Sequence, residues 1–400
     1  MAISGDAYDL ASNFPNAFKT AYISDKKIDV FAFTHKLLSE INVTENFTGS
    51  DEERVRATSH MGGYGFGDTM PRPNESNLIR PKLTAKRFYA RALIDTESIA
   101  AALDDKGAFF RLVDRVKLDI NRAIQQGLSL ALLCTNIDHE LVLGVGDGST
   151  SVTGSDPYVI TLASDTNMYR FHVKQIVNIE DGDTDLFEVT AVDRTAKTIT
   201  VDRLTGDQVP ANTDEIFLQG GDGNAYMGLP GACASSGTLY NVTLSDGGGW
   251  MATTDTSGGS LDEHRLYEMA LDIENKSGEL PNLIVLSLAQ WKKLTASLAN
   301  KRMLMNRSDE MGHRGLVLAC DSADIPVIWD RFVKDDESFV LNTNRIELHK
   351  RPMSGMASIG GDILLPDLNN DMDRYLMVYR CYGNFFIEPT FQGHFDGLDT

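Results

Sequence analysis

The most regular pattern of apolar and polar residues in this chain lies between residues 107 and 134, where apolar side chains recur at spacings of three and four. This stripe consists of Phe109, Val113, Val116, Ile120, Ala123, Ile124 and Ala131. Charged residues occupy the opposite side, and Arg115 precedes Asp119 by one turn, so the two can form an ion pair. The pattern predicts an amphipathic helix about 40 Å long. Gly127 should weaken it near its far end, and since no side chain on it suggests catalysis, we interpret the helix as a structural support.

The chain before this helix shows strand-like alternation rather than helical spacing. Residues 1–50 hold scattered apolar pieces without a sustained period, which indicates an extended arm with at most short helical turns. Residues 54–59 and 83–94 alternate, and the loop between them is rich in glycine and proline. These features predict a long hairpin over residues 51–95. A lone hairpin is only marginally stable in water, so we expect it to find a stabilising partner on another molecule.

An active-site lid is the alternative interpretation of this hairpin, because long loops often carry function. The loop holds the aromatic residues Tyr64 and Phe66 together with Arg72 and Arg80, but no plausible pair of nucleophile and base. Binding to a neighbouring molecule is therefore the preferred hypothesis.

Residues 138–225 show a different pattern of residue types from the helix that precedes them. Short runs rich in β-branched and aromatic residues are separated by polar turn clusters such as EDGDTD and DRTAK. The runs are residues 158–163, 171–179, 186–192, 198–201 and 215–219. Their spacing predicts a small β-barrel, inserted between two halves of a main domain because a mixed pattern resumes after it.

From residue 226 onward short strands alternate with helices, which indicates an α/β layer. Ser260 is a natural N-cap with Glu263 three residues later, and Gly278 should end this helix. A buried strand is expected at residues 283–286 and a second helix at residues 288–298. Further strands are expected at residues 317–318, 327–329, 338–341, 346–348, 375–382 and 384–388.

Composition places the chain among large globular proteins. Its 400 residues are 42% hydrophobic, enough to bury a sizeable core in two or three domains. Lys and Arg number 37 against 57 Asp and Glu, for a net charge of −20, which opposes direct sequence-specific binding to nucleic acid. An acidic wall would suit a container that holds DNA without sticking to it, although solubility alone explains the same charge.

The four cysteines, Cys134, Cys233, Cys320 and Cys381, are far apart and form no CxxC pair. This usage predicts reduced, mostly buried thiols in a cytosolic protein. The first residues have neither a basic segment nor an apolar segment, so we expect no signal peptide. No apolar run is long enough to span a bilayer.

Motifs that carry chemistry are missing from suitable contexts, including those of phosphate-binding, dinucleotide-binding, serine-hydrolase and zinc-protease sites. Asp181, Asp183 and Asp185 alternate without completing a calcium loop, and a solvated hairpin turn explains them better. His139 lies between two acidic residues at the end of the long helix, where a satisfied helix-end histidine is the more natural interpretation than a general base. We therefore expect no catalytic, cofactor-binding or metal-binding residues, and no enzyme activity.

Taken in order, these segments resemble the major capsid proteins of tailed bacteriophages. LPNLIVLSLAQWKKL is similar to the family's strand followed by a helix, and DIPVIWD with SFVLN to its paired strands. RYLMVYRCYGNFFIEP is similar to its late strand with a turn glycine, Gly383, and FHVKQIVNIEDGDTDLFEVTAVDRTAKTITVD to the insertion barrels of some members. The resemblance implies an α+β architecture, the Johnson fold. Its expected parts are an N-arm, an extended E-loop hairpin, a peripheral domain with a long spine helix, an axial domain and an inserted small β-barrel.

On this resemblance the chain divides into six segments. They are the N-arm at 1–50, the E-loop hairpin at 51–95, the peripheral domain with the spine helix at 96–137, the inserted β-barrel at 138–225, the axial domain at 226–352 and returning peripheral strands at 353–400.

The resemblance also implies partners and a location. Copies of the chain would assemble as hexamers and pentamers in the bacterial host cytoplasm, forming the icosahedral capsid of the virion. The shell would hold double-stranded DNA without sequence-specific binding and carry a portal protein at one vertex, with no membrane and no cofactor. The N-terminal region has no long charged coiled coil, so a separate scaffolding protein or none is implied, and a decoration protein is compatible. Residues 62–80 contain no lysine, which argues against an isopeptide cross-link there.

Contacts between copies are expected from exposed arginines and aromatic residues of the hairpin, which would meet acidic surfaces of adjacent subunits. These residues are Arg54, Arg56, Tyr64, Phe66, Arg72, Arg80, Arg87 and Arg91. A bacterial nanocompartment shell protein of the same fold, enclosing protein cargo, is the nearest alternative. A β-rich hydrolase or carbohydrate-binding protein, with a convergent pair of acids, is an alternative from another class.

Overall fold

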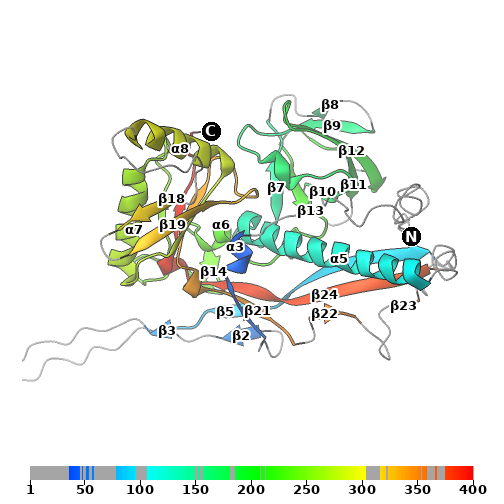
Figure 1. Ribbon diagram of the computed structural model, residues 1–400, viewed down its shortest axis with the longest axis horizontal. Helices are drawn as coiled ribbons and strands as arrows, with labels where there is room; N and C mark the ends of the chain where they lie inside the picture. Colours follow the sequence, from blue (N-terminus) through cyan, green and yellow to red (C-terminus); the bar gives the residue numbers. More distant parts are fainter. Residues whose placement is uncertain are drawn as a thin grey trace, which may run out of the picture.

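The computed structural model describes residues 36–45, 47, 51–53, 56–57, 78–95, 106–148, 152–153, 156–180, 185–207, 209–211, 213–302, 316–320, 323–352, 354–357, 365–366 and 374–399. One long helix lies along a first sheet, a second sheet with two helices stands at one end of it, and a third sheet is inserted after the helix (Figure 1).

Helix α5 (Lys106–Cys134) is the helix expected from the apolar spacing, and the structure confirms it. Val116 and Ile120 are buried on its inner side, and Arg115 pairs with Asp119 at 3.2 Å. Gly127 has a packing role rather than being a weak point. A Cβ at this position would lie 2.7 Å from Cε1 of Phe88, so the glycine allows an aromatic ring to rest on the helix backbone.

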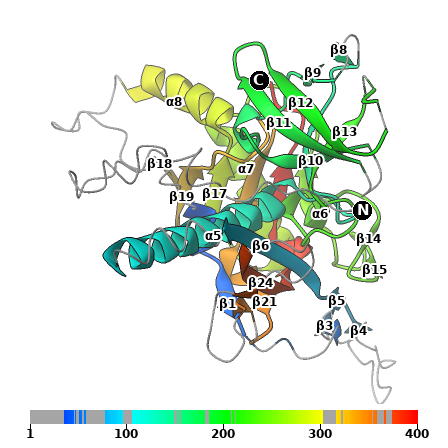
Figure 2. The same ribbon diagram turned by 90° about the vertical axis from the view of Figure 1, so that its right-hand side faces the viewer.

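The first sheet is built around β24 (Arg374–Ile387), which pairs antiparallel with β6 (Lys86–Asp95). The other members are β21 (Ile346–Lys350), β22 (Gly355–Met356) and β23 (Leu365–Pro366), which pair with β24, and β1 (Asn42–Thr44), which pairs with β21 in parallel. α5 covers one face of this sheet (Figures 1 and 2).

Gly383 does not form the turn that the sequence suggested, because β24 runs through it as one continuous strand. It lies opposite Lys350 of β21, and a Cβ would approach the Lys350 Cα to 2.9 Å and overlap the carbonyl of His349. The glycine therefore permits close contact between two strands. A glycine in a strand and a glycine in a turn look alike in sequence.

The expected hairpin is present in its described stem. β2 (Asp51–Glu53) pairs with β5 (Lys82–Thr84), and β3 (Arg56–Ala57) pairs with β4 (Leu78–Ile79), both antiparallel. Residues 58–77, the expected tip, lie outside the described residues. The base is anchored to its own subunit, since Leu83 is fully buried and the amide of Lys82 donates to the carbonyl of Tyr240 at 2.8 Å.

The second sheet has the order β16, β25, β20, β17, β19, β18. Its strands are β16 (Thr253–Asp255), β25 (Gly393–Phe395), β20 (Ser338–Leu341), β17 (Leu283–Leu286), β19 (Asp324–Trp329) and β18 (Leu316–Ala319), with helices α7 (Glu263–Ser277) and α8 (Leu288–Arg302) packed beside them. Two strands differ from the expected division at residue 352. β21 precedes that boundary but belongs to the first sheet, and β25 follows it but belongs to the second.

α7 begins two residues later than the capping-box pattern indicated. Asp262, not Ser260, is the N-cap, and its carboxylate accepts from the amide of Arg265 at 2.9 Å. Gly278 ends the helix with φ 78°, as predicted. Asp and Ser are both good N-caps, so the two positions were equivalent on sequence grounds.

The inserted sheet has the order β7, β13, β10, β11, β12, β9, β8. Its strands are β7 (Val142–Val145), β13 (Glu215–Leu218), β10 (Ile176–Ile179), β11 (Leu186–Asp193), β12 (Thr198–Thr205), β9 (Tyr158–Thr161) and β8 (Val152–Thr153). The end of β7 and the segment after β9 contact each other, because the amide of Ala163 donates to the carbonyl of Val145 at 2.9 Å. Residues 171–175, expected as part of a strand, instead form turns after the 3-10 helix η1 (Met168–Arg170).

Short elements connect these layers. They are α3 (Lys36–Ser39), α6 (Leu229–Ala232), β14 (Thr238–Leu239), β15 (Val242–Thr243), η2 (Thr343–Arg345) and η3 (Pro389–Phe391). The main core extends from the arm through α5 into the inserted sheet. None of the four cysteines forms a disulfide, and three of them are buried while Cys320 is half-buried. Among the described helices, none has the length and apolar character needed to cross a membrane.

Candidate functional site

Strand β6 sorts its side chains between two environments by simple alternation. Phe88 and Ile94 point to α5, where Ile94 is buried against Val116 and Ile120. Arg87, Tyr89 and Arg91 are exposed. The first sheet therefore has one face closed by the helix and one face that carries cationic and aromatic side chains.

The neighbouring strand extends this open face. The register places Tyr382 opposite Arg87, Arg380 opposite Tyr89 and Val378 opposite Arg91. Directly opposed residues of an antiparallel pair share a face. Arg380 is exposed and Tyr382 is half-buried, so the open face collects three arginines and two tyrosines. We call Arg87, Tyr89, Arg91, Arg380 and Tyr382 the arginine face.

Contacts within the arginine face hold Tyr89 and Tyr382 against each other. The hydroxyls of Tyr89 and Tyr382 are 3.3 Å apart and hydrogen-bonded, and the rings meet edge to face with centroids 5.9 Å apart. The guanidinium carbon of Arg87 lies 5.9 Å from the Tyr382 ring centroid, within cation–π range. Tyr89 is nevertheless 47% exposed. The face thus combines an ordered aromatic pair with exposed positive charge.

The charge of this face is not neutralised within the described part of the subunit, where no ion pair involves Arg87, Arg91 or Arg380. The hydrogen bond with Tyr89 raises the pKa of Tyr382, and partial burial adds to this effect, so the phenol stays neutral at pH 7. Three positive charges therefore have no ion-pair partner among the residues that the structure describes, on a chain whose net charge is −20. Such a surface is suited to binding an acidic partner.

The eight residues expected to contact other copies lie in different parts of the structure. Arg87 and Arg91 lie on the arginine face, and Arg80 is exposed between β4 and β5. Arg56 is in β3, but its side chain is outside the description. The remaining four, Arg54, Tyr64, Phe66 and Arg72, lie outside the described residues.

Sequence reasoning missed Tyr89, Arg380 and Tyr382 as members of this surface. Every second residue from Leu376 to Tyr382 points away from α5, and this alternation was visible in the segment RYLMVYRCY. Which face would remain uncovered depended on the position of α5, a long-range contact that local alternation does not contain.

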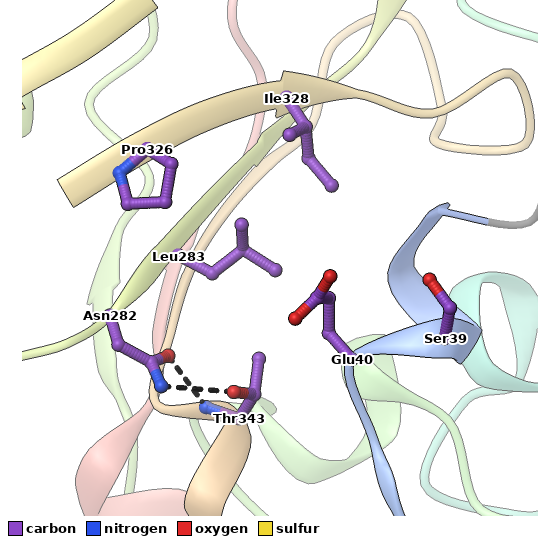
Figure 3. Close-up of a pocket in the computed structure, with 7 residues that line it drawn as sticks. All are labelled: Ser39, Glu40, Asn282, Leu283, Pro326, Ile328 and Thr343. Carbon is purple, nitrogen blue, oxygen red and sulfur yellow. Dashed lines mark hydrogen bonds between the residues drawn. The ribbon is translucent and has the colours of Figure 1, made fainter. Parts of the chain in front are cut away.

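A cavity of about 290 Å³ lies where the arm meets the second sheet (Figure 3). Glu40 points its carboxylate into it, and Leu283 and Ile328 supply apolar walls. The amide of Asn282 is already used, because its Nδ2 donates to Thr343 Oγ1 at 2.9 Å and its Oδ1 accepts from the Thr343 amide at 2.9 Å. Glu40 is the only ionisable residue among the seven that line the cavity, so the pair of groups needed for acid–base catalysis is missing there.

His139 has the structural role that its position suggested. Its Nδ1 lies 3.0 Å from the carbonyl of Ala225, and the residue adopts φ 66° at the turn after α5. Burial lowers the pKa of His139 to about 4, and the nearby charge of Lys86 acts in the same direction. A histidine that is neutral and bonded to backbone does not fit a base working near pH 7.

Comparison with known proteins gives matches only at the level of structure. No family model matches the chain, and no curated protein matches it by sequence. The capsid asymmetric unit of cyanophage A-1(L) aligns over 94% of this chain and 96% of that chain, with a TM-score of 0.56 and 10% identity. The chain has the phage capsid fold.

Two further capsids match less closely. The capsid of cyanophage P-SCSP1u has a TM-score of 0.48 with 8% identity, covering 94% of this chain and 92% of that chain. The capsid of an empty GTA particle has a TM-score of 0.45 with 11% identity, covering 96% and 98%. The expected mixed α+β capsid architecture is thus confirmed, and the argument for it rests on the cyanophage A-1(L) match.

Proposed function

We propose that the chain is the major capsid protein of a tailed double-stranded DNA bacteriophage and assembles into the icosahedral head shell. The observation that carries this proposal is the near end-to-end match to the cyanophage A-1(L) capsid subunit, with both chains covered almost completely. A match of this extent spans almost the whole chain, not a single domain shared by many proteins. The proposed activity is therefore assembly, with no catalytic step.

The proposal includes partners and a location. Copies of the chain would form hexamers and pentamers in the bacterial host cytoplasm and enclose DNA without reading its sequence. A portal protein would replace one pentamer, and separate scaffolding and decoration proteins are compatible with the chain. The acidic composition supports non-sticking contact with packaged DNA, because phosphate and carboxylate repel each other.

We further propose that the arginine face binds an acidic surface of an adjacent subunit. Its three arginines lack carboxylate partners among the described residues of their own chain, and every copy is strongly acidic overall. Neighbouring copies therefore supply the missing negative charge without any other protein. Tyr89 and Tyr382 would add apolar contact area at the same place.

Charge reversal on this face tests the interface. We expect Arg87→Glu and Arg91→Glu to reduce shell yield at least tenfold, because each places a carboxylate against an acidic neighbour. Shells would be counted by electron microscopy after gradient sedimentation. Thermal unfolding of the unassembled subunit should stay unchanged, since both residues are exposed. Shell assembly by the wild type should also weaken as salt screens the contact.

Lys292→Glu is the matched control, since it makes the same charge change at an exposed position of α8, away from the first sheet. It should assemble normally. Normal shells from both arginine variants would refute the interface, and loss of shells from the lysine variant would show a general effect of charge.

The alternatives differ in what they enclose or bind. A nanocompartment shell would contain protein rather than DNA, so nuclease-protected DNA in particles from infected cells separates the two. A hydrolase or carbohydrate-binding protein would need convergent groups lining a cleft, and the cavity in Figure 3 offers only one carboxylate.

A further inference from the structure

Three carboxylates lie close together at one edge of the second sheet, where β20 begins and β25 ends. Glu337 directly precedes β20 and Asp396 directly follows β25. These strands are antiparallel with Ser338 opposite Phe395, so the next rung places Glu337 beside Asp396. Asp336 lies one residue earlier. One carboxylate oxygen from each of the three acids lies within 4.8 Å of the others.

The chain supplies too little positive charge for this group. The ammonium of Lys334 is 3.2 Å from Asp336 Oδ2, but it is also 2.6 Å from Asp165 Oδ2 and is shared between the two. Three carboxylates therefore lie close together beside one shared ammonium group, and they repel one another when ionised.

Two buried polar atoms beside the three acids lack hydrogen-bond partners among the described residues. Asp336 Oδ1 belongs to a residue that is 9% exposed, and His394 Nε2 to one that is 8% exposed. His394 Nε2 points at the group, 4.0 Å from Glu337 Oε2. Its ring is held by stacking on Phe339, with centroids 4.7 Å apart. Unpaired buried polar atoms are rare and commonly mark a bound ion or water.

We propose that Asp336, Glu337 and Asp396 bind a divalent cation, with His394 facing the ion or its coordinated water. A carboxylate set selects a hard cation, whereas Zn²⁺ prefers nitrogen and sulfur. Ca²⁺ takes six to eight oxygens at about 2.3–2.6 Å in a flexible geometry, whereas Mg²⁺ demands a near-ideal octahedron and keeps several of its waters. A set of three protein carboxylates at one place therefore suits Ca²⁺. Asp396 is half-buried, which leaves the ion a route from solvent.

The cation would stabilise a junction between two layers of the subunit. The loop before β20 contacts the inserted sheet through the Lys334–Asp165 pair and through Arg170 Nε, which donates to the carbonyl of Phe332 at 2.9 Å. Binding at the carboxyl end of this loop would fix Asp336 and Glu337, and thereby the position of the inserted sheet. The role is structural and does not depend on the proposed assembly.

Thermal unfolding of the full chain, dialysed against chelator and then titrated with CaCl₂, tests the site. We expect the midpoint to rise by about 3 °C when Ca²⁺ exceeds its Kd about 100-fold. Isothermal titration should give one ion per chain. Glu337→Gln and Asp396→Asn should each remove most of the rise. Both variants should fold without calcium, because each relieves repulsion among the acids.

Asp272→Asn is the matched control, since it removes an exposed carboxylate of α7 outside the group, and its rise should equal that of the wild type. A wild-type chain that shows neither a rise nor a binding heat with CaCl₂ would overturn the proposal. So would retention of the rise in Glu337→Gln or Asp396→Asn. If a variant fails to fold, the titration of the wild type decides the question alone.

Discussion

The contact between Gly127 and Phe88 is one of the places where α5 packs on the first sheet. Replacing Gly127 by Ala would gain about 1 kcal/mol of helix propensity. The new Cβ would also lie 2.7 Å from one ring atom of Phe88 and closer to another, and overpacking of this kind costs about 1–3 kcal/mol. We expect Gly127→Ala to lower the free energy of unfolding by about 1 kcal/mol, measured by urea denaturation.

A second substitution distinguishes this crowding from any other effect of alanine. Phe88→Leu removes the ring, so Gly127→Ala should become neutral or stabilising in that background, because only the propensity gain remains. Equal losses in both backgrounds would contradict the assigned contact.

His139 makes stability depend on pH through its buried, neutral state. Its pKa is about 4 in the folded chain and about 6.5 when unfolded. As pH falls from 6.5 to 4, the unfolded chain gains a proton that the folded chain does not, so stability is lost over this window and is unaffected above it.

The test of this linkage is the difference between the wild type and His139→Asn, since asparagine tolerates the positive φ at this position. Between pH 6.5 and 4, the wild-type free energy of unfolding should fall more steeply than that of the variant, by about 1 kcal/mol per pH unit. Other buried histidines contribute equally to both proteins and cancel. Parallel curves would contradict the buried neutral state.

At the scale of elements, the inserted sheet is held to the second layer by η1. Asn167 caps this 3-10 helix by accepting from the Tyr169 amide at 3.0 Å, and its Nδ2 lies 2.8 Å from the carbonyls of both Arg331 and Val333. Asn167→Ala would remove both of these hydrogen bonds and the cap, at a cost of about 2–3 kcal/mol. Faster hydrogen exchange should appear in residues 329–335.

Thr190→Ala is the control for this prediction. Its hydroxyl donates to the carbonyl of Thr200 at 3.2 Å within the inserted sheet, at an exposed site, so its loss should cost less than about 0.5 kcal/mol. Exchange in residues 329–335 should not change in this variant. Equal effects of the two substitutions would argue against η1 as the attachment point.

The elements that could be predicted from sequence were those whose signal is local. α5 and the stem of the hairpin follow periodic patterns of apolar and polar residues, and β17 is a short apolar run that is buried throughout. All three elements are present. Gly383 was misread because close strand approach and turn formation both select glycine. The sequence also could not predict which sheet β21 and β25 join, because their pairing partners are distant in sequence.

The candidate interface could be predicted only in part, for a related reason. Arg87 and Arg91 were recognisable as cations on alternating positions of a strand. Their grouping with Arg380 and Tyr382 required the pairing of β6 with β24, which joins residues almost three hundred positions apart. The acids at residues 336, 337 and 396 were hidden in the same way, because the pairing of β20 with β25 brings them together.

At the scale of the whole molecule, the proposed assembly would explain why a strongly acidic subunit carries a cationic face without ion-pair partners among its described residues. An isolated monomer gains nothing from three unpaired arginines on one sheet, whereas copies that meet through opposite charges do. The extended match to a capsid subunit shows the fold, and the charge distribution supports the proposed assembly separately.

Sedimentation velocity of the purified chain over a wide concentration range, with electron microscopy of the fastest fraction, tests this conclusion most directly. The account predicts a cooperative transition from subunits or small rings to closed shells of uniform size. A single-chain species at every concentration and salt condition, with no larger particle, would contradict it.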